Sequence, residues 1–103
     1  MADPMRIRAN VTGDSTEVRV LMSHQMETGQ RKDAAGKVIP AWFIQNVSAT
    51  HNGRNVLAAQ WGPAVSQNPF LSFKFKGGAK GDKIQITWVD NRGDKRTDEA
   101  LIA

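Results

Sequence analysis

The sequence contains no cysteine, which excludes disulfides, thiolate metal sites and a cysteine nucleophile among its 103 residues. It also lacks any run near the ~18–20 apolar residues that a membrane-spanning helix requires. The first residues, Met1–Arg6, include no apolar stretch of the kind found in signal peptides. Taken alone, the sequence therefore predicts a soluble cytoplasmic protein with no membrane partner.

A large excess of charge is also missing. Fourteen basic residues against ten acidic ones give a net charge of +4, and these charges are spread along the chain. This surplus is small for a nucleic-acid-binding domain. Lys74 and Lys76 alternate with Phe73 and Phe75, which suggests a nucleic-acid patch. However, the two phenylalanines share the core face of Leu71, so we expect the lysines to be simply solvated and no nucleic acid to bind.

No segment shows the 3.6-residue period of an amphipathic helix, and apolar residues instead recur with a period of two. A change of phase between Ile44 and Val47 predicts a β-bulge or bend. Asn52-Gly53, between two apolar runs, predicts a hairpin. We expect one domain, residues 1–103, folded as an immunoglobulin-like antiparallel β-sandwich of about seven strands. The expected strands lie at residues 5–11, 18–22, 39–52, 56–61, 71–75, 84–88 and 95–103.

A polar stretch, Glu27–Val38, breaks the alternation and predicts a loop. Its three cations, Arg31, Lys32 and Lys37, are expected either to be solvated or to contact anionic surfaces of other proteins. Further along the chain, His51 precedes the Asn52-Gly53 turn, and we expect this imidazole to be solvated.

Met22, His24 and Met26 lie at a spacing of two, which places two thioethers and one imidazole on the same face of a strand. Such soft ligands suit Cu(I), so a periplasmic copper-binding sandwich is one hypothesis. The alternative is that Met22 continues the core face of the preceding strand and that His24 anchors the loop. We favour packing and predict no metal and no cofactor.

The sequence offers no arrangement of residues for catalysis. Ser23 and His24 are adjacent and would point to opposite faces of a strand, so they cannot act as nucleophile and base. A paired acid, a triad and a Gly-x-Ser-x-Gly turn are all lacking. We therefore predict that the chain is not an enzyme.

Several strands have apolar residues on both faces, although one face of an antiparallel sandwich strand normally meets water. The second face must be covered either by a loop of the same chain or by a partner protein, and a domain this small has few residues to spare. We predict a partner surface that draws on Trp42, Ile44, Val56, Ala58 and Phe70. Self-association of the isolated chain is possible for the same reason.

Three segments form a distinctive set: the first is Met22–Asp33, which continues to Ile39-Pro40; the second is Gly62–Phe70; the third is Thr87–Asp90, followed by Gly93. These segments resemble those of the SoxZ family, the small subunits of SoxYZ sulfur carriers in bacterial thiosulfate oxidation. In order, spacing and length, the resemblance extends over residues 16–100. The first two segments are specific, whereas the third alone is weak.

The resemblance implies an immunoglobulin-like sandwich that forms a heterodimer with a SoxY-type subunit. In that family SoxY holds the sulfur substrate on a cysteine of its carboxy-terminal arm, and the complex makes transient contacts with the Sox enzymes. A thiolate is the nucleophile that such an attachment needs, and this chain has none. The resemblance also implies a periplasmic location, reached by export together with the partner.

Overall fold

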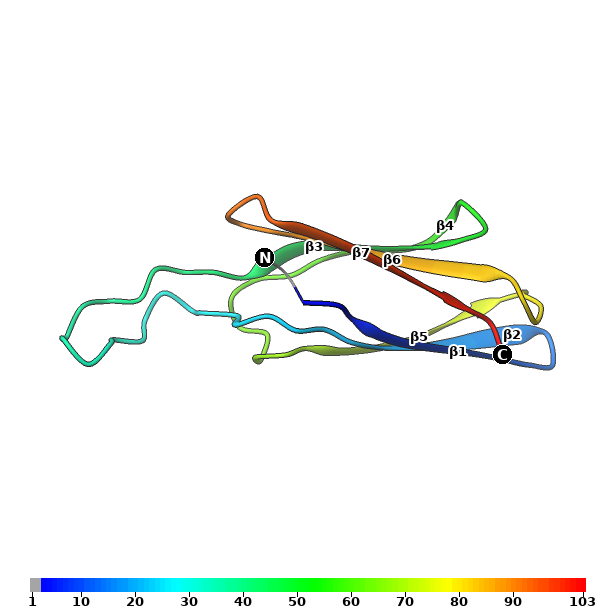
Figure 1. Ribbon diagram of the computed structural model, residues 1–103, viewed down its shortest axis with the longest axis horizontal. Helices are drawn as coiled ribbons and strands as arrows, with labels where there is room; N and C mark the ends of the chain where they lie inside the picture. The colour runs from blue at the N-terminus through cyan, green and yellow to red at the C-terminus, as the bar shows by residue number, and fades with distance from the viewer. Residues whose placement is uncertain (1–2) are drawn as a thin grey trace.

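The computed structural model describes residues 3–103. Residues 1–2, which the expected domain includes, lie outside the described residues. The expected all-β fold is confirmed: the chain forms seven strands in two antiparallel sheets (Figure 1). The strands are β1 (Arg6–Thr12), β2 (Ser15–Leu21), β3 (Ile44–His51), β4 (Arg54–Gln60), β5 (Phe70–Lys76), β6 (Lys83–Asp90) and β7 (Lys95–Leu101). Within the described residues, no helix is long and apolar enough to cross a membrane.

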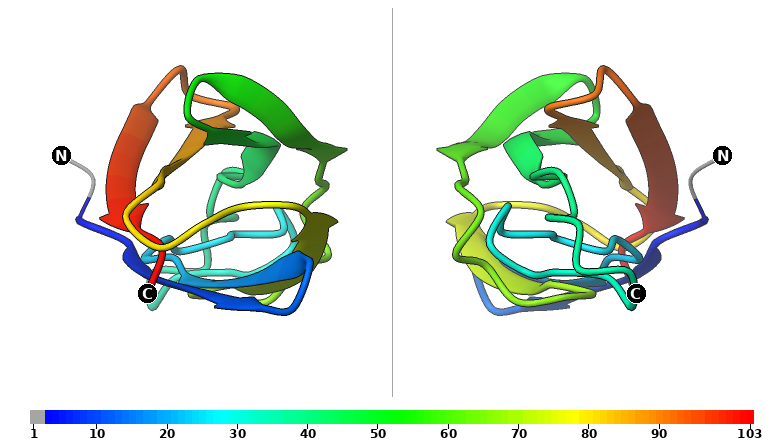
Figure 2. Two further views of the ribbon diagram at one scale, coloured as in Figure 1. Left: turned by 90° about the vertical axis from the view of Figure 1, so that its right-hand side faces the viewer. Right: turned by 90° about the vertical axis from the view of Figure 1, so that its left-hand side faces the viewer.

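The two sheets pack face to face as a sandwich (Figure 2). One sheet has the strand order β1-β2-β5 and the other has the order β4-β3-β6-β7. Between them, the inward positions of β2 and β6 form the centre of the core. Val18, Ile84 and Ile86 have no exposed surface, and Trp88 is 1% exposed. Each such side chain contributes about 1.5–3 kcal/mol through its burial, so these two strands dominate the hydrophobic stabilisation.

One side of the sandwich is closed by the carboxy-terminal residues. The amide of Val11 donates to the carbonyl of Ala103 at 3.2 Å, and the amide of Ala103 donates to Ala9 at 2.8 Å. Ile102 is buried beneath this connection. The edge of β1 is therefore paired at Ala9 and Val11, and the carboxy-terminal residues lie between β1 and β7 (Figure 2).

The opposite side, bounded by the edge strands β4 and β5, is less well covered (Figure 2). Apolar residues that pack against the core here are only half-buried, unlike their counterparts on β2 and β6. We call this region the open side; its residues are Val56, Leu57, Ala59, Trp61, Leu71, Phe73 and Phe75. The core thus thins from the closed side toward the open side.

Two irregularities in β3 explain the phase changes of the sequence. The register of β3 shifts between Ile44 and Asn46 against β6, which confirms the expected bulge. A second shift, between Ala49 and Thr50 against β4, places both Val56 and Leu57 against the core. The apparent two-faced character of these segments therefore comes partly from bulges, and the second of them was not foreseen.

The two-residue hairpin between β3 and β4 is confirmed, with positive φ angles of 49° at Asn52 and 86° at Gly53. The expectation for His51 was wrong. Its Nε2 lies 2.7 Å from Asp82 Oδ2, and its ring lies 5.0 Å from that of Phe75. The half-buried imidazole thus ties the end of β3 to the loop before β6.

Between β2 and β3 the chain forms a long arm, residues 27–42, which projects beyond the sheets (Figure 1). At its base the backbones of Glu27 and Trp42 exchange hydrogen bonds of 2.6 and 3.0 Å. Further out, Ile39 donates to Arg31 at 2.7 Å. The arm accounts for the elongated shape of the molecule, 53 × 20 × 19 Å. The predicted loop is therefore a narrow antiparallel excursion with only isolated bridges.

Candidate partner interface

The three sequence segments that resemble SoxZ meet at the base of the arm. The amide of Met22 donates to the carbonyl of Pro69 at 2.9 Å. The amide of His24 donates to Asn68 Oδ1 at 3.0 Å, and the amide of Asn68 donates to the carbonyl of His24 at 2.9 Å. Segments separated by more than 40 residues in sequence are therefore joined at one end of the sandwich.

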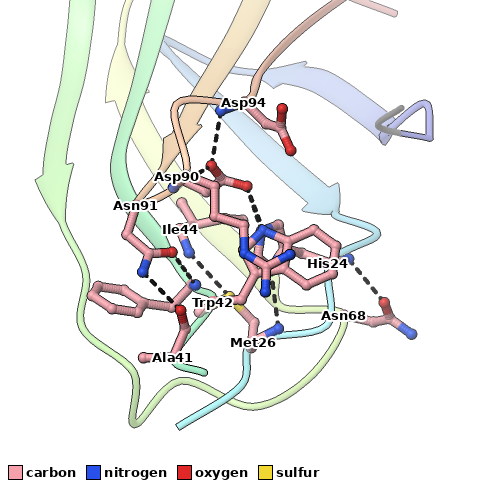
Figure 3. Close-up of polar contacts among 11 residues, drawn as sticks. His24, Met26, Ala41, Trp42, Ile44, Asn68, Asp90, Asn91 and Asp94 are labelled. Atoms are coloured by element: carbon pink, nitrogen blue, oxygen red, sulfur yellow. Dashed lines mark hydrogen bonds and ion pairs between the residues drawn. The ribbon is translucent and has the colours of Figure 1, made fainter. Parts of the chain in front are cut away.

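His24 and Asp90 form the centre of this junction (Figure 3). His24 Nδ1 accepts a hydrogen bond from the amide of Met26 at 3.0 Å, which places the ring proton on Nε2. His24 Nε2 then donates to Asp90 Oδ2 at 3.1 Å. Trp42 Nε1 donates to the same oxygen at 2.7 Å. The imidazole also packs edge-on against the rings of Trp42 and Trp88.

The Asp90 carboxylate is fully used by these contacts. Its other oxygen, Oδ1, accepts hydrogen bonds from the amides of Arg92 and Asp94, each at 2.9 Å. Burial acts to raise the pKa of Asp90, but the hydrogen bonds from Trp42 and His24 and from the two amides outweigh it, so the pKa is lowered. A carboxylate with four donors is a structural anchor and has no lone pair positioned to serve as a general base.

The arrangement does not favour the copper hypothesis. Both nitrogens of His24 are engaged by hydrogen bonds, and Met26 Sδ accepts a hydrogen bond from the amide of Ile44 at 3.3 Å (Figure 3). Met22 is 1% exposed and belongs to the core. Among residues 3–103, no group of three or more His, Cys, Asp or Glu side chains is placed to hold a metal.

A cavity of about 150 Å³ lies beside this junction, with Ser23, His24, Trp42 and Trp88 in its wall. Ligand pockets usually measure ~300–1,000 Å³, so this cavity is small for a metabolite. Trp88 Nε1 is buried and finds no protein acceptor among the described residues. The arm's base thus contains space for water but no arrangement of reactive groups.

The five residues predicted for the partner surface lie in different environments. Ile44 is 0% exposed and belongs to the core, so its inclusion was wrong: the bulge after it turns it inward. Trp42 is half-buried, with Arg92 4.2 Å above its ring. Val56 is half-buried on the open side, whereas Ala58 is exposed on the outer face of β4. Phe70, at 62%, is largely exposed. The structure therefore does not gather the five into one patch.

Sequence reasoning missed the apolar neighbour of Phe70. Leu21 is 43% exposed and lies directly opposite Phe70 in the register of β2 and β5. The alternation of β2 contains the evidence, because the inward positions Val18 and Val20 place Leu21 on the outer face. Leu71, Phe73 and Phe75 of β5 were expected on the core face, but their incomplete burial was missed. The alternation of a strand gives no measure of how well the opposite sheet covers it.

The cations of the arm differ in how they are engaged. Arg31 makes three hydrogen bonds to the Glu27 carboxylate, the shortest at 2.7 Å. These bonds lower the pKa of Glu27 and raise that of Arg31. Lys32 and Lys37 are exposed, as is Val38. Arg31 therefore stiffens the arm, while the two lysines remain solvated in the chain alone.

Comparison with protein-family models matches residues 5–101 to the family described as sulphur oxidation protein SoxZ. The chain belongs to the SoxZ family. The match covers nearly all of the described residues and includes the arm and both sheets. SoxZ membership makes it a protein of sulfur oxidation.

Solved structures share the fold at low sequence identity. A hypothetical protein, PH1083 from Pyrococcus horikoshii OT3, aligns with a TM-score of 0.64 and 16% identity over 99% of this chain and 89% of that one. A superoxide reductase (neelaredoxin) from Ignicoccus hospitalis aligns with a TM-score of 0.56 and 15% identity, covering 99% of this chain and 82% of that one. These likenesses concern the fold alone. No curated protein matches significantly.

Proposed function

We propose that this chain is the non-catalytic subunit of a SoxYZ-type sulfur carrier in thiosulfate oxidation. It forms a heterodimer with a SoxY-type subunit, whose cysteine holds the sulfur substrate, and it helps to present that subunit to the Sox enzymes. Membership of the SoxZ family supports this role. The absence of cysteine agrees with it, because the thiolate that binds sulfur must then come from the partner.

The observation that carries the proposal is the open side. Here half-buried apolar residues, among them Leu57, Leu71 and Phe73, lie between two edge strands that have no further strand beside them in the described chain. Burying apolar surface is worth about 25 cal/mol per Å², and the edge strands offer free backbone donors and acceptors. A SoxY-type subunit seated here completes the coverage of the core.

The partner also explains the proposed location. The family works in the periplasm, and we propose that this chain is exported together with a SoxY-type subunit that carries the signal. This requires the heterodimer to form before export, so the interface must be assembled in the cytoplasm. A tight hydrophobic contact on the open side suits such an early association.

Co-expression with a SoxY-type subunit, followed by size-exclusion chromatography, tests the proposal. We expect one peak that contains both chains at micromolar concentration. Val56→Arg places a cation on the open side and is expected to weaken the complex at least tenfold. Leu101→Arg is the matched control, because Leu101 is 64% exposed on the edge strand β7, across the sandwich. This variant is expected to change the affinity by less than twofold.

The two variants separate a lost interface from a lost fold. Thermal unfolding of each isolated chain shows whether Val56→Arg remains folded, and only a folded variant counts. Separate elution of the two unmodified subunits at micromolar concentration would overturn the heterodimer. Equal weakening by both variants would remove the open side as the interface.

A further inference from the structure

The fold collects basic side chains that the sequence scatters. On the outer face of the β1-β2-β5 sheet, the outward positions include Arg6 and Arg8 on β1, Arg19 on β2, and Lys74 and Lys76 on β5. Glu17 is the one acidic residue among the outward positions of these three strands. Five cations and one carboxylate give this face a charge of +4, which equals the net charge of the whole chain. We call it the basic face.

The register shows how closely these charges are placed. Arg8 lies directly opposite Arg19, and like charges at such positions destabilise a sheet. Arg19 contacts Glu17 at 3.0 Å, whereas Arg6, Arg8, Lys74 and Lys76 form no ion pair with any of residues 3–103. The fold therefore tolerates a largely uncompensated positive surface, and an external anion would relieve this repulsion.

The other sheet provides a direct contrast. The exposed positions of β3, β4, β6 and β7 are mostly neutral, with Arg54, Lys83, Lys95 and Glu99 as the charged residues. Lys83 and Glu99 pair at 3.1 Å, which leaves two cations, Arg54 and Lys95, without an ion pair among residues 3–103. Solubility alone would not require most of the excess charge to gather on one sheet. The asymmetry therefore points to recognition of a partner by the basic face.

Two features of the basic face favour a protein over a nucleic acid or a membrane. Glu17 lies between Asn10 and Lys74 in the middle of the face, where a continuous line of phosphates would meet a repelling carboxylate. At one end, the exposed pair Leu21 and Phe70 lies beside Arg6 and supplies a small apolar contact. Phe70 is the one aromatic residue on the face, so there is no series of rings on which bases could stack.

We propose that the basic face binds the acidic surface of a second protein, with carboxylates opposite Arg8, Arg19 and Lys74 and an apolar group against Leu21 and Phe70. Exposed charges of this kind mainly accelerate association and give only modest affinity. The contact is therefore transient and weakens with salt. This inference is independent of the SoxY-type partner, which occupies the open side.

Isothermal titration with three probes of matched charge tests the basic face at 100 mM NaCl. The probes are a glutamate-rich peptide with a central leucine, a short DNA duplex and a vesicle that contains phosphatidylglycerol. We expect the peptide to bind most tightly. In nuclear magnetic resonance spectra, it should shift the backbone amide signals of β1, β2 and β5. A duplex or vesicle that binds more tightly than the peptide would overturn the assignment to a protein.

A pair of charge-matched double variants distinguishes the face from net charge. Arg8→Glu with Lys74→Glu changes the basic face, and Lys83→Glu with Lys95→Glu makes the same charge change on the other sheet. Each pair also brings one new carboxylate beside an existing one, Glu17 or Glu99 respectively. We expect at least a tenfold loss of peptide affinity for the first pair and less than a threefold loss for the second. Equal losses would contradict the proposal.

Discussion

At the scale of single residues, the anchor between His24 and Asp90 best explains how the arm is held. One carboxylate receives donors from the arm, from the strand-to-arm connection and from its own turn. The sequence predicted that His24 anchors the loop, and this is confirmed. It did not reveal the partner, because Asp90 lies 66 residues away and its place in the hairpin turn gave no sign of burial.

Removing the Asp90 side chain is expected to destabilise the protein strongly. Asp90→Ala leaves the buried donors of His24 and Trp42 without an acceptor, so we expect a loss of about 3 kcal/mol in the free energy of unfolding. Urea denaturation measures this change. Asp94→Ala is the control, because this side chain is exposed and four residues away, and we expect a change within about 0.5 kcal/mol. A small effect of Asp90→Ala would contradict the anchor.

Carboxylates with a lowered pKa, Asp90 among them, determine how stability depends on pH. The pKa values of Asp82, Asp90 and Asp98 are all lowered in the folded protein; the hydrogen bond from His51 is the main cause for Asp82, and that from Arg96 for Asp98. Groups with a lowered folded pKa stabilise the protein above their unfolded pKa of about 3.8–4, and this contribution is lost as the pH falls through the folded value.

We therefore expect the free energy of unfolding to change little from pH 7 to pH 5 on account of these groups and to fall below about pH 4. Asp90→Asn should lessen that fall, because it removes one of the carboxylates whose pKa is lowered in the folded protein. Denaturation midpoints measured at several pH values test this. A variant that loses stability between pH 4 and pH 2 as steeply as the unmodified protein would show that Asp90 does not contribute.

At the scale of elements, most strands follow from the alternation of apolar residues, and the bulge in β3 follows from its change of phase. The open side could not be predicted in the same way. Phe73 and Phe75 alternate as regularly as Ile84 and Ile86, yet only the second pair is fully buried. The difference depends on what the opposite sheet places above them, and that is a property of the whole sandwich. The gathering of cations on the basic face depends on strand order in the same manner.

The tip of the arm, beyond its base, is expected to contribute little to the stability of the sandwich. Replacing residues 32–38 by Asn-Gly keeps the bond between the amide of Ile39 and the carbonyl of Arg31 and forms a two-residue turn. Because the removed residues are exposed, we expect the melting temperature to change by less than about 3 °C. Circular dichroism measures it. A decrease of more than about 8 °C would mean that the arm's tip stabilises the core.

At the scale of the whole molecule, the sandwich has three distinct surfaces: a closed side sealed by its own carboxy-terminal residues, an open side with thin coverage, and a basic face. A scaffold subunit needs one lasting contact and exposed surfaces for brief ones. We propose that the open side provides the first through apolar burial and that the basic face provides the second through charge. The two contacts respond to different conditions, since salt weakens only the charged one appreciably.

Hydrogen–deuterium exchange of the chain alone and with a SoxY-type subunit shows whether the partner binds the open side. The amides at the free edges of β4 and β5 should exchange quickly in the isolated chain and become protected in the complex. The amides of β1 and β7 should change little, because these strands lie on the closed side, away from the proposed interface. Protection confined to β1 and β7, or no change in β4 and β5 when the complex forms, would rule out the open side as the interface.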